Sequence, residues 1–446
     1  MKRNFGFILA GITALLLYGC FGSGGSSAPA PTNVAVVAKD SRVIVTWDMT
    51  PGVDYWIWKA AASGVTPDNC SSLPSCGIAV GVTSPASISV ANGSTLALTN
   101  GTAYSFSINA RTNGGPGGFG SPAVDATPRL SGATWNAGAP VSSASSAPNL
   151  RGVTYGNLFV AVGENGALFS STDVSNSSTN GTIWTAATSI PAAATTTTLY
   201  AVSYDAFLTR YMVTGSGGMI LQSTDAATWT QLTSSTTSDL RAIANNGGTT
   251  FVATGASGTI TTSTNGGSAW AVQNSGTLNS LNGIVYGHGN NTTTPGNIFV
   301  AVGAAGTVLY SANGLSWSAA TSVSTPSSDI NGVTYGLING VGTFVAVTAD
   351  GNVITSTDGS TWTTVASGLS ALNAVTASLN AAVPLSTTVT NAFVAVDNTG
   401  NIFRSTDGGV SWSPVGTSTN PLYAVTRGGL YDYSAVGAAG TNLYAD

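Results

Sequence analysis

Few side chains in this sequence are of the types that enzymes use for acid–base or nucleophilic chemistry. The only histidine, His288, lies in the loop sequence Gly-His-Gly-Asn-Asn without Cys or carboxylate neighbours, so neither a Ser-His-Asp triad nor a metal site is expected. The carboxylates that remain as candidates are Glu164, Asp239, Asp329, Asp350 and Asp397. Two of them about 5 to 10 Å apart could hydrolyse a glycosidic bond. Because turns commonly carry Asp, we expect no catalytic residue, no metal and no cofactor, and glycoside hydrolysis is the alternative.

The charge content argues against two broad classes of protein. Only 7% of the residues are charged, against about 25% in ordinary globular chains, while 43% are hydrophobic. Disorder driven by charge is excluded, because it requires low hydrophobicity. Twelve basic and seventeen acidic residues give a net charge of -5, which provides no basic surface for a phosphate backbone. Nucleic-acid binding is therefore not expected.

The first 19 residues have the order of a secretory signal peptide, with a cationic start and an apolar run over residues 5–18. The run is too short to cross a bilayer as a helix. Its end, Leu17-Tyr-Gly-Cys20, resembles the bacterial lipobox, which implies cleavage before Cys20 and lipid attachment to its thiol. Residues 20–32 then form the lipidated cysteine and a flexible tether rich in Gly, Ser and Pro. No Asp follows Cys20, so we expect an exported lipoprotein at the outer membrane or cell surface.

The two other cysteines, Cys70 and Cys76, are close in sequence and have no His near them. An even pair in an exported chain predicts a small disulfide loop rather than a metal site.

Residues 33–128 contain short runs of alternating apolar residues, such as 43–47 and 104–110, which are separated by Gly, Pro, Asn and Asp. This pattern predicts antiparallel strands of a β-sandwich. The positions of Trp47 and Tyr104 resemble those of a fibronectin type III domain, which implies a core tryptophan, a tyrosine corner and a role as spacer or adhesion unit. Trp56 and Trp58 share one face of a strand and are interpreted as packing residues, with a sugar-binding platform as the alternative.

A six-residue pattern occurs seven times within residues 129–446. It reads Leu-Arg-Gly-Val-Thr-Tyr at 150–155 and recurs from Leu199, Leu240, Leu281, Ile330, Leu372 and Leu422. Each copy is followed by two further strands joined by a tight turn, and six copies by a tryptophan that marks a fourth strand. The seventh tryptophan is Trp135, ahead of the first copy. We therefore predict an all-β chain: a fibronectin type III sandwich, then a seven-bladed β-propeller closed by its own N- and C-terminal strands.

The turns before these tryptophans, such as Ser356-Thr-Asp-Gly-Ser-Thr-Trp362, resemble the Asp-boxes, or BNR repeats, of sialidases and of photosystem II stability factor-like propellers. The resemblance covers residues 129–446 and implies the fold, but one fold carries many functions. Sialidases begin with an Arg-Ile-Pro type of motif that this sequence lacks, so sialidase activity is not expected.

The second residue of the six-residue pattern is always able to form hydrogen bonds. The seven copies are Arg151, Tyr200, Arg241, Asn282, Asn331, Asn373 and Tyr423, which should surround the mouth of the propeller channel. A solvated rim explains this polarity. The alternative is a binding ring with Glu164 nearby, in which the arginines hold an anionic group and the tyrosines stack on a ligand. We expect a non-enzymatic, surface-anchored binding or assembly scaffold whose partner is a protein or a glycan.

Overall fold

The computed structural model describes residues 26–39, 42–89, 96–142, 147–171, 183–290, 295–324, 328–378, 391–428 and 432–445. They belong to two compact units, unit 1 within residues 1–130 and unit 2 within residues 131–446. The predicted all-β class is confirmed, because the only helices in these ranges are short 3-10 turns. None of these turns is long and apolar enough to cross a membrane. The expected signal peptide and Cys20 lie outside the described residues.

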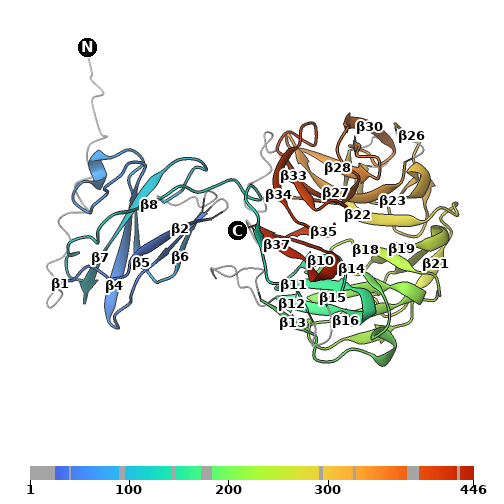
Figure 1. Ribbon diagram of the computed structural model, residues 1–446, viewed down its shortest axis with the longest axis horizontal. Helices are drawn as coiled ribbons and strands as arrows, with labels where there is room; N and C mark the ends of the chain where they lie inside the picture. Colours follow the sequence, from blue (N-terminus) through green and yellow to red (C-terminus); the bar gives the residue numbers. More distant parts are fainter. Residues whose placement is uncertain are drawn as a thin grey trace, which may run out of the picture. The chain divides into compact units, whose positions relative to one another are not determined.

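Unit 1 consists of two antiparallel sheets, drawn in blue and cyan in Figure 1. The larger sheet has the order β1 (Ser26–Ala28), β7 (Tyr104–Thr112), β4 (Val53–Ala60) and β5 (Gly77–Val82), with β8 (Val124–Ala126) also paired to β7; the smaller sheet has the order β2 (Ala35–Lys39), β3 (Arg42–Thr46) and β6 (Ala86–Ser89). The core between them is built from alternate residues of the strands, such as Tyr55 and Ile57 of β4. This alternation is the period of two that the sequence shows.

The residues singled out in unit 1 have structural roles. Trp47 is buried in the core, and the Tyr104 hydroxyl accepts a hydrogen bond from the Thr99 amide at 2.9 Å. Cys70 and Cys76 form a disulfide with a Cα–Cα distance of 5.3 Å, beside the 3-10 turn η1 (Cys70–Ser72).

Trp56 and Trp58 are half-buried on the face of β4 away from the core. Trp58 Nε1 donates to Asn109 Oδ1 at 2.9 Å, and the Arg111 guanidinium lies 4.8 Å from the centre of the Trp56 ring. Both rings therefore pack against the protein's own side chains.

One expectation for this region is wrong in part. A flexible tether was expected as far as residue 32, but Ser26–Ala28 forms β1 and pairs with Thr112, Arg111 and Ala110 of β7. Ala28 is only 7% exposed and belongs to the core. Its burial stabilises a segment whose Ser-rich composition is otherwise typical of a linker.

The described residues of unit 2 form seven sheets in succession along the chain. The strands are, sheet by sheet: β10 (Leu150–Tyr155), β11 (Phe159–Gly163), β12 (Leu168–Ser171), β13 (Trp184–Ala186); β14 (Leu199–Asp205), β15 (Arg210–Gly215), β16 (Ile220–Ser223), β17 (Thr230–Leu232); β18 (Leu240–Asn245), β19 (Phe251–Gly255), β20 (Ile260–Ser263), β21 (Ala271–Gln273); β22 (Leu281–Asn290), β23 (Pro295–Gly303), β24 (Val308–Ser311), β25 (Ser318–Ala319); β27 (Ile330–Ile338), β28 (Val341–Thr348), β29 (Val353–Ser356), β30 (Thr361–Ala366), with β26 (Ser322–Val323) parallel to β30; β31 (Leu372–Ala377), β32 (Phe393–Asp397), β33 (Asn401–Ser405), β34 (Ser413–Thr417); β35 (Leu422–Arg427), β36 (Tyr433–Gly437), β37 (Asn442–Ala445), β9 (Asn136–Ala137). The remaining 3-10 turns are η2 (Glu164–Gly166), η3 (Ala192–Ala194), η4 (Ser216–Gly218), η5 (Ala256–Gly258), η6 (Ala304–Gly306) and η7 (Ala438–Gly440).

The first and seventh sheets of unit 2 meet. The innermost strand β10 contacts both β14 of the next sheet and β35 of the last one, as Figure 1 shows where green and red strands lie side by side. β9, from ahead of the first sheet, pairs with β37 through Asn136 and Tyr444, and the Trp135 ring lies 6.0 Å from that of Tyr433. The two ends of the unit are therefore held in one sheet.

The core of unit 2 lies between neighbouring sheets. The second strand of each sheet contains a Phe or Tyr that is at most 2% exposed: Phe159, Tyr211, Phe251, Phe299, Phe344, Phe393 and Tyr433. Strands such as β11 are buried along their whole length, because a sheet lies on each side. Because burying a charge is costly, strands covered on both faces contain few charged residues, which accounts for the low charge content of the chain.

The turns that precede the strand-four tryptophans are held by hydrogen bonds within each turn. The Asp225 carboxylate accepts from the amides of Ala227 and Thr228 at 2.9 and 2.8 Å. These bonds lower the pKa of Asp225 to about 2. Trp229 Nε1 donates back to the Ala226 carbonyl at 3.2 Å, which fixes the ring between the sheets.

Candidate functional site

Every innermost strand of unit 2 contains a β-bulge at the same place. The β10–β11 pairing passes from Leu150 to Gly152, and each of the other six sheets repeats this irregularity. The residues left out of the pairing are Arg151, Tyr200, Arg241, Asn282, Asn331, Asn373 and Tyr423, the seven positions of the expected ring. A bulge releases a residue from the ladder and redirects its side chain. The bulges thus place these side chains at the edge where the innermost strands begin.

Three of the seven side chains donate to a backbone carbonyl of the next sheet. Asn282 Nδ2 donates to the Ile330 carbonyl at 3.2 Å. Asn331 Nδ2 donates to Leu372 at 2.8 Å, and Asn373 Nδ2 to Leu422 at 2.7 Å. In each case the acceptor is the first residue of the innermost strand of the next sheet. We call these three asparagines the inter-sheet locks, since their amides are used to hold the ring.

The other four side chains come from adjacent sheets, the seventh, first, second and third. We call Tyr423, Arg151, Tyr200 and Arg241 the rim arc. The Arg151 guanidinium lies over the Tyr423 ring at 4.4 Å. Arg241 Nη1 donates to Asn282 Oδ1 at 2.9 Å, and the Tyr200 hydroxyl donates to Asp239 Oδ2 at 3.5 Å. The arc therefore gathers cationic and aromatic groups from four adjacent sheets on part of the rim.

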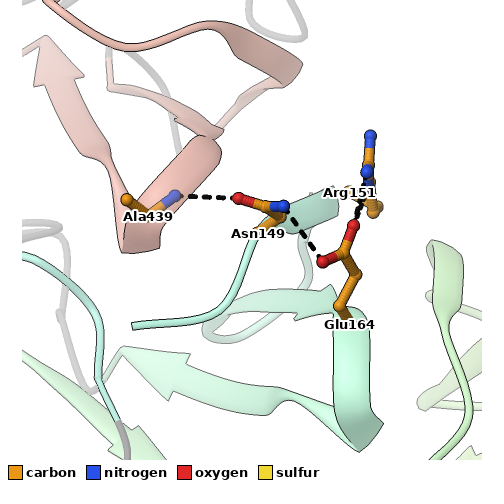
Figure 2. Close-up of polar contacts among 4 residues, drawn as sticks. All are labelled: Asn149, Arg151, Glu164 and Ala439. Carbon is orange, nitrogen blue, oxygen red and sulfur yellow. Dashed lines mark hydrogen bonds and ion pairs between the residues drawn. The ribbon is translucent and has the colours of Figure 1, made fainter. Parts of the chain in front are cut away.

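Glu164 connects the rim arc to the junction between the first and seventh sheets (Figure 2). Its carboxylate pairs with Arg151 through Nη2 and, at 3.2 Å, through Nε. Asn149 Nδ2 donates to the same carboxylate at 3.0 Å, and Asn149 Oδ1 accepts from the Ala439 amide of the seventh sheet at 3.0 Å. Glu164 therefore neutralises Arg151, and the cluster holds the ring closed.

Arg241 differs from Arg151 because it donates to the neutral amide of Asn282 and its side chain is exposed. In the part of the chain that the structure describes, no carboxylate pairs with it. Burial raises the pKa of the Tyr200 phenol and the Asp239 charge raises it further, whereas the positive charges of Arg241 and Arg151 act in the opposite direction. Tyr200 is thus within the field of both arginines.

The five candidate carboxylates accept hydrogen bonds from different partners. Asp239 Oδ1 accepts from the Gly217 amide at 2.9 Å, and Asp329 Oδ1 accepts from the Ala305 amide at 2.9 Å. Each of these bonds joins a turn of one sheet to the segment that enters the next one.

Asp350 and Asp397 accept hydrogen bonds from their own turns and from the segment ahead of the first strand of the same sheet. Burial would raise the pKa of the Asp350 carboxyl, but hydrogen bonds from Thr348 and other groups outweigh this effect and lower it. Asp397 is fully buried, and hydrogen bonds from Ser370 and Asn401 lower its pKa in the same way. A general acid of a glycosidase needs a raised pKa, so neither group resembles one.

The possible metal ligands of unit 2 include the only histidine, His288. His288 Nδ1 is 2.9 Å from Asn297 Oδ1, an amide partner and not a carboxylate. Across the described ranges there is no group of three or more His, Cys, Asp or Glu side chains that could hold a metal ion.

Two recesses are lined by residues that bond to the rim arc or to its partners. One, of about 180 Å³, has Glu164, Pro148 and Ile190 in its wall. The other, of about 720 Å³, is bounded by Gly217, Gly218 and residues 231–237, with several Ser and Thr hydroxyls. The Gly217 amide that borders it is the one held by Asp239. Both recesses are open to solvent.

Asn149 is the residue of this site that sequence reasoning missed. It directly precedes the first copy of the six-residue pattern, as Asp239 and Asp329 precede the third and fifth copies. The recurrence of Asn or Asp at this position was the available signal. In the structure all three side chains accept a hydrogen bond from a turn amide of the preceding sheet around the ring.

Comparison with known proteins shows the fold. No protein-family model matches this sequence, and no curated protein matches it. The solved structure of YCF48 bound to a D1 peptide is similar with a TM-score of 0.52 and 16% identity, over 70% of this chain and 94% of that chain. The WD40 β-propeller domain of Doa1 gives 0.52 and 11% over 71% and 98% of the two chains, and YCF48 from Cyanidioschyzon merolae 0.49 and 17% over 70% and 99%. The chain therefore contains a β-propeller.

Proposed function

We propose that this chain is a non-enzymatic, surface-anchored binding scaffold whose rim arc binds a partner protein. In this proposal unit 2 is a seven-bladed Asp-box propeller closed by β9, and unit 1 is a fibronectin type III spacer. A lipid on Cys20 anchors the chain at the outer membrane or cell surface. The observation that carries the binding proposal is that four adjacent bulges present Tyr423, Arg151, Tyr200 and Arg241 as one row.

The composition of the rim arc favours a protein partner. Arg and Tyr are enriched among the residues that contribute most to protein–protein affinity, because they combine large contact area with directional hydrogen bonds. Arg241 has the charge best placed for a carboxylate of the partner, since Arg151 is neutralised by Glu164. YCF48, a propeller of similar fold, is known with a D1 peptide bound. Peptide binding by that protein supports a peptide segment as the ligand type here.

The assignments of unit 1 and the anchor have their own support. The buried Trp47 and the Tyr104 hydroxyl bond to the Thr99 amide fit a fibronectin type III domain. The order of cationic start, apolar run and Leu17-Tyr-Gly-Cys20 supports the lipid anchor.

The test is capture of partners by the full chain from membranes of the source organism, followed by affinity measurements with the purified partner. Arg241→Gln removes the charge and keeps a side chain of similar length. We expect at least about tenfold weaker binding, equivalent to about 1.4 kcal/mol. The matched control is Asp225→Asn, which changes one charge at the opposite ends of the strands and reproduces the residue of the sibling turn at Asn265.

Unchanged affinity in both Arg241→Gln and Tyr200→Ala would refute binding by the rim arc. A glycan array with the same chain separates the two partner classes, because glycan binding that Arg241→Gln abolishes would replace the protein by a carbohydrate ligand.

A further inference from the structure

Two of the segments that leave a fourth strand share one sequence pattern. They read Trp-Thr-Ala-Ala-Thr-Ser-Ile at 184–190, in the first sheet, and Trp-Ser-Ala-Ala-Thr-Ser-Val at 317–323, in the fourth sheet. After the second Ala the chain crosses to the outer edge of the next sheet. We call residues 188–190 and 321–323 the straps.

The strap of the first sheet pairs in parallel with the fourth strand of the second sheet. The Thr188 amide donates to the Ala227 carbonyl at 2.9 Å, and the Trp229 amide donates to the Ser189 carbonyl at 2.9 Å. Ser189 lies opposite Thr228. The strap therefore acts as a short fifth strand and satisfies backbone groups of an edge that would otherwise be open.

The strap of the fourth sheet repeats this arrangement on the fifth sheet. The Thr321 amide donates to the Ser360 carbonyl at 2.9 Å, and Ser322 lies opposite Thr361. This strap contains β26, which is labelled beside β30 in Figure 1. The same sequence pattern thus produces the same crossover at two places in the ring.

The straps also cover the tryptophans of the sheets that receive them. Ile190 packs against the cluster that contains Trp229, and Val323 packs against the cluster that contains Trp362. These two tryptophans are 3% and 1% exposed. The β-branched residue at the end of each strap therefore contributes apolar contacts in addition to the backbone bonds.

The fourth sheet has the same acceptor edge but receives no strap. Its residues 315–317 follow Asn313 with the spacing at which residues 227–229 follow Asp225 in the second sheet. In the part of the chain that the structure describes, neither the Leu315 carbonyl nor the Trp317 amide has a hydrogen-bond partner. Leu315 is 42% exposed, and Trp317 is only half-buried. This edge is open where the equivalent edges are filled.

The segment between the third and fourth sheets takes another path. Within residues 274–280, Asn279 Nδ2 donates to Thr307 Oγ1 at 2.8 Å, and in the described structure no residue of this segment bonds to the open edge. Residues of the segment and of the edge, including Ser275 and Trp317, line a recess of about 400 Å³. No charged residue lines this recess.

We propose that the outer edge of the fourth sheet, residues 315–319, docks an extended segment of a partner protein. The segment pairs in parallel with the Leu315 carbonyl and the Trp317 amide and places a β-branched side chain beside the Trp317 ring. On an open edge, main-chain bonds provide affinity and side-chain pockets provide selectivity.

The straps define the chemistry of the docked segment. It is uncharged, with small hydroxyl residues followed by Ile or Val, as in Thr-Ser-Ile and Thr-Ser-Val. Both straps are already paired within unit 2, so a second copy of the chain has no free strap to offer. The occupant is therefore another protein, and this site is separate from the rim arc.

The test is disulfide trapping on the full chain. Ser322 lies opposite Thr361 in the fifth sheet, and the residue equivalent to Thr361 on the open edge is Ser316. The probe is the synthetic peptide Ser-Ala-Ala-Thr-Cys-Val-Ser, the sequence of residues 318–324 with Cys in place of Ser322. It is equilibrated with the Ser316→Cys chain in a glutathione redox buffer. Thr361→Cys is the matched control, because Thr361 is equally exposed but the chain's own strap lies opposite it.

We expect at least about tenfold more mixed disulfide with Ser316→Cys than with Thr361→Cys, because a docked peptide presents its thiol at a high effective concentration. A second peptide with Pro in place of Thr lacks the amide that Thr321 donates to Ser360. It should lose the preference for Ser316→Cys.

Equal trapping at the two positions, or a preference that the proline peptide retains, would overturn the docking site. Disulfide-linked dimers of the Ser316→Cys chain that form in preference to the peptide adduct would overturn the partner protein as the occupant and assign the edge to a second copy.

Discussion

The second strands of unit 2 allow a sharp test of how the sheets pack. The position three residues after the buried Phe or Tyr of these strands is valine in five sheets, at Val162, Val302, Val347, Val396 and Val436. In the two other sheets it is Thr214 and Thr254, both fully buried. Neither hydroxyl has a hydrogen-bond partner in the described structure. A group that loses its hydrogen bonds to water on folding and gains none in return destabilises the native state.

Thr254→Val should therefore increase the free energy of unfolding. A buried hydroxyl without a partner costs about 1–3 kcal/mol, and Thr and Val have nearly the same volume, so no cavity forms. We expect a gain of about 1–2 kcal/mol. Val302→Thr, at the same position of the next sheet, is the reciprocal variant and should lose a similar amount.

Urea unfolding of the full chain, followed by tryptophan fluorescence of unit 2, measures both changes as shifts of the midpoint at constant slope. Destabilisation by Thr254→Val would refute the reasoning, because it would show that the hydroxyl is satisfied in the folded protein. Equal stability of Val302→Thr and the parent would show that the pocket at this position tolerates a hydroxyl without cost.

Three other predictions concern turns and the ring. Ala305 has a positive φ of 51° and is exposed, whereas the equivalent Gly217, at φ 64°, has open space where a Cβ would be. Ala305→Gly should therefore raise the free energy of unfolding by about 0.5–1 kcal/mol, and Gly217→Ala should lower it by a similar amount. Thermal midpoints measure both changes. Because the folded-state pKa of Asp225 is lowered to about 2 from 3.8, its stabilising contribution is present above pH 4 and is lost as the pH falls toward 2; Asp225→Asn should make unfolding less dependent on pH in that range, and an unchanged slope would contradict this. Asn331→Ala removes the bond to Leu372 and should lower the free energy of unfolding by about 1 kcal/mol without changing partner affinity, the reverse of Arg241→Gln.

The sequence carried most of the information about the propeller because its signals are local and repeated. Seven copies of the six-residue pattern correspond to the innermost strands, from β10 at Leu150 to β35 at Leu422. The displaced Trp135 indicated that a strand ahead of the first copy belongs with the last, as β9 does. A repeated apolar pattern indicates which residues are buried. Because each sheet packs against its neighbours in the same way, the same positions are buried in every copy.

Other features could not be predicted, because they depend on contacts between distant segments. The seven bulges are invisible in the pattern, since a bulged and a regular strand can begin with the same residues. Whether a rim side chain such as Asn331 acts as a lock depends on the carbonyl of Leu372, 41 residues later. β1 was missed because Ser26-Ser-Ala resembles a linker, and only the open edge of β7 makes it a strand.

Removing the charge of Arg151 and removing that of Arg241 would test different properties of the protein. Arg151 is 34% exposed and bonded to Glu164, and through Asn149 this pair reaches Ala439 of the seventh sheet. Removing Arg151 leaves Glu164 without its ion partner at the junction of the ring, so any loss of binding would be mixed with a loss of stability. Arg241 is exposed and donates to Asn282, and among the described residues no carboxylate pairs with it, so its charge can be removed without leaving one unpaired. A variant of Arg241 therefore measures partner binding without disturbing the junction between the first and seventh sheets. A variant of Arg151 would change both.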